Sequence, residues 1–174
     1  MNRDPEPVSL PALVDVDRGI ISREIFVDED VYRQEQQQIF ARAWLFVGHE
    51  SQIPRPGDFL VSSMGEESVI LCRDRGGHLH VFLNSCRHRG MKVCRYDEGN
   101  TVEFMCPYHG WSYATDGALV GVPFAKDAYG EQLDRGRWGL IEVAITGDEG
   151  RECRSAHGAV SSGAIRSAPL RRVL

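Results

Sequence analysis

The middle of the chain consists of short apolar runs separated by residues that favour turns. Seven of these runs have the length of β-strands, and they cover residues 44–48, 59–64, 68–72, 79–83, 102–105, 112–114 and 119–120. Clusters rich in Gly, Pro, Asn and Asp lie between them. Short strands at this spacing predict an all-β fold, which we expect to be a small antiparallel barrel or sandwich.

One amphipathic helix is predicted ahead of these strands. Asp28 is a suitable N-cap, and two acidic residues follow it in the first turn. Val31, Ile39 and Phe40 are spaced so that they share one face of a helix. This apolar stripe needs a partner surface, and without one it would be exposed and would promote association.

The pattern divides the chain into three segments. Residues 1–42 form an N-terminal helical arm whose first twenty residues are expected to be loosely held, and residues 43–145 contain the strands. Residues 146–174 are expected to form an irregular tail, because from residue 147 onward they lack aromatic side chains and are rich in Arg, Ser, Ala and Gly.

Net charge, apolar run length and cysteine content limit the classes of function and the compartment that the sequence allows. The chain has 174 residues and a net charge of −5, which argues against nucleic-acid binding because that function requires an excess of Lys and Arg. No apolar run is long enough to cross a membrane, and the first residues lack the apolar core of a signal peptide. The five cysteines then indicate free thiols and metal ligation in the cytoplasm instead of a disulfide framework.

Two short motifs each combine one cysteine with one histidine, and seventeen residues separate them. The four candidate metal ligands are Cys86, His88, Cys106 and His109. Each pair follows a predicted strand and is followed closely by a glycine, Gly90 or Gly110, which permits positive φ and a close approach of the backbone. Two such loops at neighbouring strand ends can hold one inorganic cluster between them.

Two kinds of metal site have this ligand composition. A set of two cysteines and two histidines can hold structural zinc, but zinc fingers usually place both cysteines in one half and both histidines in the other. Here each motif contains one cysteine and one histidine. This arrangement favours a Rieske-type [2Fe–2S] cluster, in which the cysteines bind one iron and the histidines bind the other. A third possibility is that the four residues have unrelated roles.

The segments Cys86-Arg87-His88-Arg89-Gly90 and Cys106-Pro107-Tyr108-His109-Gly110-Trp111 resemble the N-terminal Rieske domain of the α subunits of bacterial aromatic-ring-hydroxylating dioxygenases. The resemblance extends from about residue 21 to about residue 143. It implies a domain that relays single electrons from a ferredoxin or reductase, within an assembly of α and sometimes β subunits. In that family a second domain holds a mononuclear Fe(II) with two histidines and a carboxylate, and this iron activates O₂ to dihydroxylate an aromatic ring.

The resemblance also implies roles for residues beside the ligands. Trp111 stands where respiratory-chain Rieske proteins have a serine, and Tyr108 stands where they have a disulfide cysteine. We therefore expect a reduction potential at the low end of the Rieske range, roughly −150 to +300 mV. Trp111 is expected to cover the cluster, and Tyr113 to donate its hydroxyl to a cysteine sulfur. Arg87 and Arg89 are either solvated charges or contacts for a partner subunit or donor protein.

The C-terminal segment lacks the ligands of a catalytic iron. Its one histidine, His157, cannot complete the Fe(II) triad, so the chain alone is not expected to oxygenate a substrate. We expect a truncated α subunit, with a frame shift near residues 143–147 as one origin. The alternative is a free-standing Rieske ferredoxin, which has little use for the N-terminal arm.

The remaining cysteines and paired histidines are expected to have no metal. Cys72 and Cys94 are predicted to be packed free thiols, and Cys153 an exposed thiol. His78 and His80 alternate along a strand, but no carboxylate stands at a suggestive spacing, so we expect a surface pair.

Overall fold

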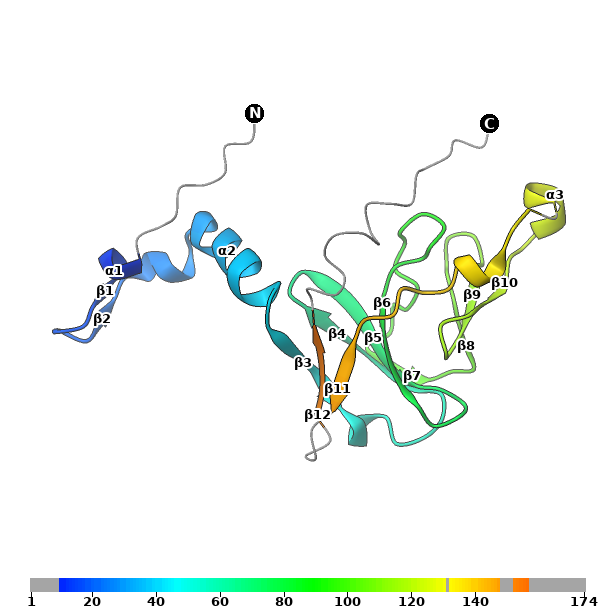
Figure 1. Ribbon diagram of the computed structural model, residues 1–174, viewed down its shortest axis with the longest axis horizontal. Helices are drawn as coiled ribbons and strands as arrows, with labels where there is room; N and C mark the ends of the chain where they lie inside the picture. The colour runs from blue at the N-terminus through cyan, green and yellow to red at the C-terminus, as the bar shows by residue number, and fades with distance from the viewer. Residues whose placement is uncertain (1–9, 131, 148–151, 157–174) are drawn as a thin grey trace.

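The computed structural model describes residues 10–130, 132–147 and 152–156, and Figure 1 shows an N-terminal arm that reaches away from a β-domain. The arm contains α1 (Leu10–Leu13), β1 (Val14–Asp15), β2 (Ile20–Ile21), η1 (Arg23–Phe26), α2 (Glu29–Glu35) and η2 (Gln36–Phe40). It is more regular than predicted, since β1 and β2 pair as a short antiparallel ribbon ahead of the predicted helix. No helix in these described ranges is long and apolar enough to span a bilayer.

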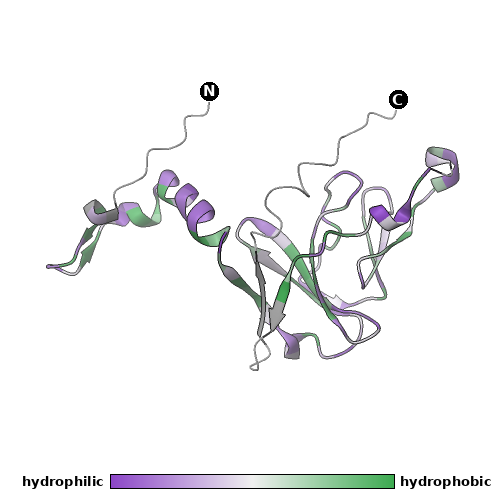
Figure 2. Cartoon of the chain, viewed as in Figure 1, coloured by the Kyte–Doolittle hydropathy of each residue, from purple (hydrophilic) through white to green (hydrophobic). Residues whose placement is uncertain are grey.

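The predicted helix is α2, and its apolar stripe is only partly covered. Asp28 caps it, with its carboxylate accepting two backbone N–H groups of the first turn at 2.8 and 3.0 Å. Val31 is buried, and the hydroxyl of Tyr32 donates to the carboxylate of Glu66 at 2.9 Å, which joins the helix to the β-domain. Ile39 remains 53% exposed, and the outer turns of α2 are hydrophilic (Figure 2).

All seven predicted strands are present in the β-domain. They are β3 (Trp44–His49), β4 (Asp58–Met64), β5 (Glu67–Arg73), β6 (Leu79–Leu83), β8 (Glu103–Met105), β9 (Ser112–Ala114) and β10 (Leu119–Gly121). A further strand, β7 (Glu98–Asn100), lies in a cluster of turn formers between two of the predicted strands and pairs with β4. This strand has no apolar side chain, so its pairing depends on backbone hydrogen bonds that the sequence pattern does not reveal.

The central sheet has the order β6-β5-β4-β7 and is buried on both faces. One face contributes to a core of Val47, Ile53, Leu60, Met64, Val69, Leu71, Val81, Leu83 and Val143. The alternate residues Phe59, Ile70 and Phe82 face a second core, which also contains Cys86, Cys106 and Trp111. Burial on both faces explains why the apolar runs are continuous, and it places the candidate ligands at the margin of a rigid core.

Two smaller sheets complete the domain. Strands β8, β9 and β10 form an antiparallel sheet in the order β10-β9-β8, and short helices η3 (Glu50–Gln52), α3 (Ala125–Tyr129) and η4 (Arg135–Arg137) lie in the connections. The third sheet has the order β11-β12-β3, with β11 at Ile145–Gly147 and β12 at Glu152–Ala156.

The irregular tail expected from residue 146 needs a correction at its start. β12 pairs antiparallel with β3, from Glu152 opposite His49 to Ala156 opposite Trp44. This pairing uses backbone groups at the edge of β3, which a segment of almost any composition can satisfy. Residues 148–151 and 157–174 of the expected tail lie outside the described residues.

Two loops near one end of the domain have the same backbone hydrogen bonds, one after β6 and one after β8 (Figure 1). In each, the cysteine carbonyl accepts from the N–H of the glycine four residues later, for Cys86 and Gly90 at 2.8 Å and for Cys106 and Gly110 at 3.0 Å. The cysteine N–H in turn donates to the carbonyl of the residue after the glycine, at 2.8 Å in both loops. Both glycines have positive φ, 73° and 69°, so each loop is closed by a conformation that favours glycine.

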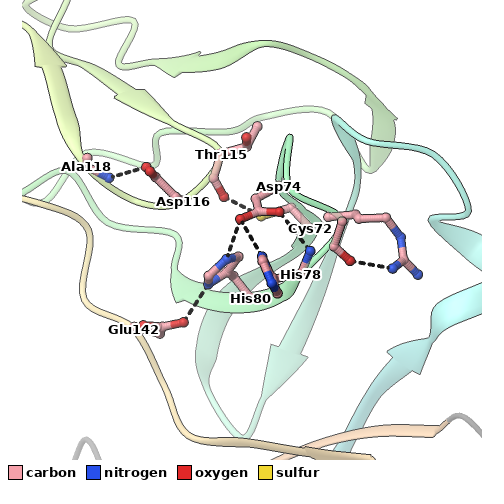
Figure 3. Close-up of polar contacts among 10 residues, drawn as sticks. Cys72, Asp74, His78, His80, Thr115, Asp116, Ala118 and Glu142 are labelled. Atoms are coloured by element: carbon pink, nitrogen blue, oxygen red, sulfur yellow. Dashed lines mark hydrogen bonds and ion pairs between the residues drawn. The ribbon is translucent and has the colours of Figure 1, made fainter.

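Asp74 is the centre of a polar network at the end of β5 (Figure 3). Its Oδ2 lies 3.3 Å from Nδ1 of His78 and 3.3 Å from Nε2 of His80, and Nδ1 of His80 lies 2.7 Å from a carboxylate oxygen of Glu142. Partial burial acts to raise the pKa of Asp74, but hydrogen bonds from the His78 backbone and the two imidazoles outweigh it and hold the pKa at about 2. The two histidines therefore belong to a polar network with Asp74 and Glu142, which the sequence pattern did not indicate. Within residues 10–130, 132–147 and 152–156, however, no three His, Cys, Asp or Glu side chains are placed to hold a single metal ion.

We expect Gly110→Ala to destabilise the protein more than Gly90→Ala. Either alanine is strained at positive φ by about 1 kcal/mol. At residue 110 the new Cβ would also lie 2.9 Å from Cγ of Pro123, whereas at residue 90 the nearest atom is 3.9 Å away. Urea unfolding of the two variants measures the difference, and equal midpoints would contradict it.

We expect Asp74→Asn to destabilise the protein at neutral pH, with the difference from wild type becoming smaller in acid. A carboxylate whose pKa is lowered from 3.8 to about 2 by folding contributes stability above pH about 4, and this contribution is lost as the pH falls toward 2. Thermal unfolding of both proteins, followed by circular dichroism at matched pH values from 7 to 2.5, gives the comparison. A difference that stays constant across this range would show that the network contributes no pH dependence.

Candidate metal centre

The two candidate cysteines come from different loops and meet in one core. Cys86 is 3% exposed and Cys106 is 2% exposed. Burial raises the pKa of the Cys86 thiol, and the neighbouring Cys106 raises it further, while the hydroxyl of Tyr113 acts in the opposite direction. If both thiols were ionised, two thiolates held this close in a buried position would require a positive partner, which a metal can supply.

The two candidate histidines also meet. The ring centroids of His88 and His109 are 4.7 Å apart, with the rings steeply inclined at 72°. Nδ1 of His88 is buried and has no hydrogen-bond partner in the described part of the chain. Burial lowers the pKa of His88, which favours the neutral imidazole that binds metals. An unsatisfied buried nitrogen of this kind fits a ligand to a metal.

The surroundings of the two histidines differ. Trp111 is 3% exposed and stacks on the ring of His88, with centroids 5.0 Å apart and planes 7° from parallel. The hydroxyl of Tyr129, at the end of α3, lies 3.4 Å from Nε2 of His88. His109 is exposed, and its ring lies against the ring of Tyr108, which is also exposed. The two ring centroids are 3.8 Å apart. His88 is therefore partly buried between aromatic side chains, whereas His109 is open to solvent.

Tyr113 connects the two loops. It belongs to β9, and its fully buried hydroxyl lies 3.3 Å from Sγ of Cys86 and accepts the backbone N–H of Arg87 at 3.1 Å. Burial raises the pKa of Tyr113, so the group stays protonated and can donate to a thiolate. Trp111 therefore lies against the ring of His88, and the hydroxyl of Tyr113 lies within hydrogen-bond distance of the sulfur of Cys86.

Asn84 is a positioning residue that the sequence pattern did not reveal. It is 3% exposed, and its Oδ1 accepts the backbone N–H groups of Val93 and Cys94 at 3.0 and 2.8 Å. Its Nδ2 donates to the carbonyl of Cys94 at 2.7 Å. These bonds close the segment that carries Cys86 and His88. A polar residue directly after an apolar strand and two residues before a candidate ligand was the available indication.

The remaining cysteines agree with their predicted roles where the structure describes them. Cys72 and Cys94 are buried and unpaired, and their thiols donate to the backbone carbonyls of Thr115 and Tyr96 at 3.4 and 3.5 Å. Burial raises the pKa of Cys72 to about 12, which is the behaviour of a packed thiol. The side chain of Cys153 lies outside the described residues.

The four candidate ligands form two like pairs, with the cysteines together and the histidines together. A binuclear cluster takes two protein ligands at each iron, and a Rieske cluster takes both cysteines at one iron and both histidines at the other. The paired arrangement fits such a cluster.

Comparison with known proteins agrees with this geometry. Residues 43–136 match the family model described as the Rieske [2Fe-2S] domain. The α subunit of biphenyl dioxygenase from Metapseudomonas furukawaii is 41% identical over 145 residues, which are 80% of this chain and 32% of that protein. The α subunit of the N,N-dimethyl phenylurea N-demethylase of a Sphingobium species is 48% identical over 128 residues, 74% of this chain and 28% of that protein.

Solved structures agree on the fold. Naphthalene 1,2-dioxygenase from a Rhodococcus species superposes with a TM-score of 0.72 and 46% identity, over 75% of this chain and 30% of that one. The chain therefore spans about a third of the length of the relatives it matches. The family match covers more than half of the chain, and the matched relatives are α subunits. The chain belongs to the Rieske [2Fe-2S] domain family, in the form found in the α subunits of aromatic-ring-hydroxylating dioxygenases.

Proposed function

We propose that Cys86 and Cys106 hold one iron of the [2Fe–2S] cluster and that His88 and His109 hold the other. The observation that carries this assignment is the pairing of two buried thiols beside two imidazoles, one of which has a buried Nδ1 without a partner in the described chain. When bound, a Rieske cluster takes up and releases single electrons at a potential raised by its histidine ligands.

The residues around this site have separate tasks. The hydroxyl of Tyr113 would donate to the sulfur of Cys86 and so stabilise the more negative, reduced state of a bound cluster. Trp111 fixes the plane of the His88 ring and excludes water from one side of it. Asn84 holds the backbone of the first loop, so that its ligands do not have to be ordered when the metal binds.

In the whole protein, the domain relays electrons from a ferredoxin or reductase toward a mononuclear Fe(II) in a catalytic domain of an α subunit. That reaction needs ligands that this chain lacks in residues 137–174, where His157 is the single histidine. The exposed apolar residues of the arm favour a subunit over a free-standing ferredoxin, because Phe26 is 77% and Val27 63% exposed. Free buried thiols favour the cytoplasm as the compartment.

Anaerobic purification tests the ligand assignment. We expect two irons and two sulfides per chain, and after reduction the low-average-g electron paramagnetic resonance signal of a histidine-ligated binuclear cluster. Cys86→Ser and Cys106→Ser are each expected to abolish the signal, because thiolate is the ligand that this iron requires. The matched control Cys94→Ser removes a buried thiol outside the site and should retain full iron content. A zinc-containing, colourless wild type would overturn the assignment.

Tyr113→Phe should lower the reduction potential. The hydrogen bond is expected to stabilise the reduced cluster by about 1 kcal/mol more than the oxidised cluster. Its loss then lowers the reduction potential of this one-electron couple by roughly 40 mV. Redox titration of the loaded protein measures this shift, with Tyr96→Phe as a control because the side chain of Tyr96 is 77% exposed. An unchanged potential would show that the Tyr113 hydroxyl does not stabilise the reduced state.

A further inference from the structure

The charge of the chain is unevenly distributed around the candidate metal centre. The net charge is −5, yet no acidic residue occurs between Asp74 and Asp97. Within that interval, four cations stand in the nine residues that surround the ligand His88: Arg87, Arg89, Lys92 and Arg95. An acidic protein thus presents a local concentration of positive charge on the loop between β6 and β7. We call the surface formed by these four side chains the basic loop surface.

The cations of the basic loop surface are available to a partner. Arg89, Lys92 and Arg95 are exposed, and within the described chain none of the four forms an ion pair with a carboxylate. Arg87 is half-buried, and its guanidinium lies 5.9 Å from the centre of the Trp138 ring. Internal ion pairing therefore does not account for this charge.

The same loop also carries exposed apolar and aromatic side chains. Met91 is 38% exposed and Tyr96 is 77% exposed. Protein interfaces commonly combine such residues with a surrounding rim of charge. The backbone beneath them is held by the Asn84 hydrogen bonds, so the surface is ordered before a partner arrives.

We propose that the basic loop surface docks the acidic face of a one-electron donor protein. The proposal rests on the proposed function, and it adds where the donor binds and the charge that the donor must carry. Exposed, unpaired charges act over long range and are screened by salt, which suits a brief encounter that must form and dissociate at each electron delivery. Because Arg87 and Arg89 adjoin the ligand His88, a donor bound there lies against the loop that holds the centre.

The test measures how fast a reduced donor delivers an electron to the loaded protein. The probe is an acidic plant-type [2Fe–2S] ferredoxin, whose potential near about −400 mV makes the transfer favourable. For wild type we expect the second-order rate constant to fall about tenfold or more between 20 and 300 mM salt, because steering of opposite charges is screened. A rate constant that is independent of salt would overturn the proposal without any variant.

Charge reversal identifies the surface. The triple variant Arg89→Glu, Lys92→Glu and Arg95→Glu is expected to lower the rate constant at low salt by about tenfold or more. Its matched control reverses three exposed arginines elsewhere, Arg23→Glu, Arg42→Glu and Arg75→Glu, and gives the same change in net charge with an expected loss below about twofold. Equal losses in the two triple variants would show a general charge effect and would overturn the docking site.

A cationic reductant separates damage to the centre from loss of docking. Reduced methyl viologen should reduce wild type and the first triple variant at rates that do not fall with the reversal. The neutral variant Arg89→Gln, Lys92→Gln and Arg95→Gln should give an intermediate rate with ferredoxin.

Analytical ultracentrifugation tests whether the surface instead binds a second copy of the chain. Wild-type self-association that the charge reversal abolishes, with an unchanged ferredoxin rate, would assign the surface to that second copy. A wild type that viologen cannot reduce would refute the proposed function itself, whereas a viologen-reducible protein that is insensitive to the reversal refutes only the docking site.

Discussion

The hydroxyl of Tyr113 joins the two loops that carry the candidate ligands and fixes their positions relative to each other. It extends from β9, beside the second ligand loop, and reaches both the sulfur of Cys86 and the backbone N–H of Arg87 in the first loop. Neither loop alone contains enough ligands for a binuclear cluster. The site therefore depends on a packed core between the central sheet and the sheet β10-β9-β8, and the buried tyrosine places a hydrogen-bond donor beside the sulfur of Cys86 in this core.

Much of the centre could be predicted because its chemistry is local in sequence. The mixed pairs of cysteine and histidine occupy a few consecutive residues, and the following glycines have the positive φ that tight loops require. The seven strands were also predictable, since each is a short apolar run bounded by turn formers. Continuous apolar runs were a weaker indication of which face each side chain occupies, because the central sheet is buried on both sides.

The contacts that could not be predicted join residues far apart in sequence or use backbone groups alone. Tyr129 approaches His88 only because α3 returns across the second core. β7 and β12 have no apolar alternation, and their pairing is decided by unpaired edges of β4 and β3. Glu142 reaches His80 from sixty-two residues away, so the sequence suggested a bare histidine pair where the structure has a polar network. Local patterns reveal ligands and strands, and long-range packing decides what surrounds them.

The segment 141–143 covers the free edge of β6, since Leu83 donates to the carbonyl of Ile141 at 2.9 Å and Val143 donates to the carbonyl of Val81 at 2.8 Å. During synthesis, β4, β5 and β6 leave the ribosome well before this segment does. For that interval the nascent sheet has an open, apolar border, which is a template for aberrant pairing between neighbouring chains. Iron that is inserted before the covering segment emerges would therefore bind to an unfinished domain.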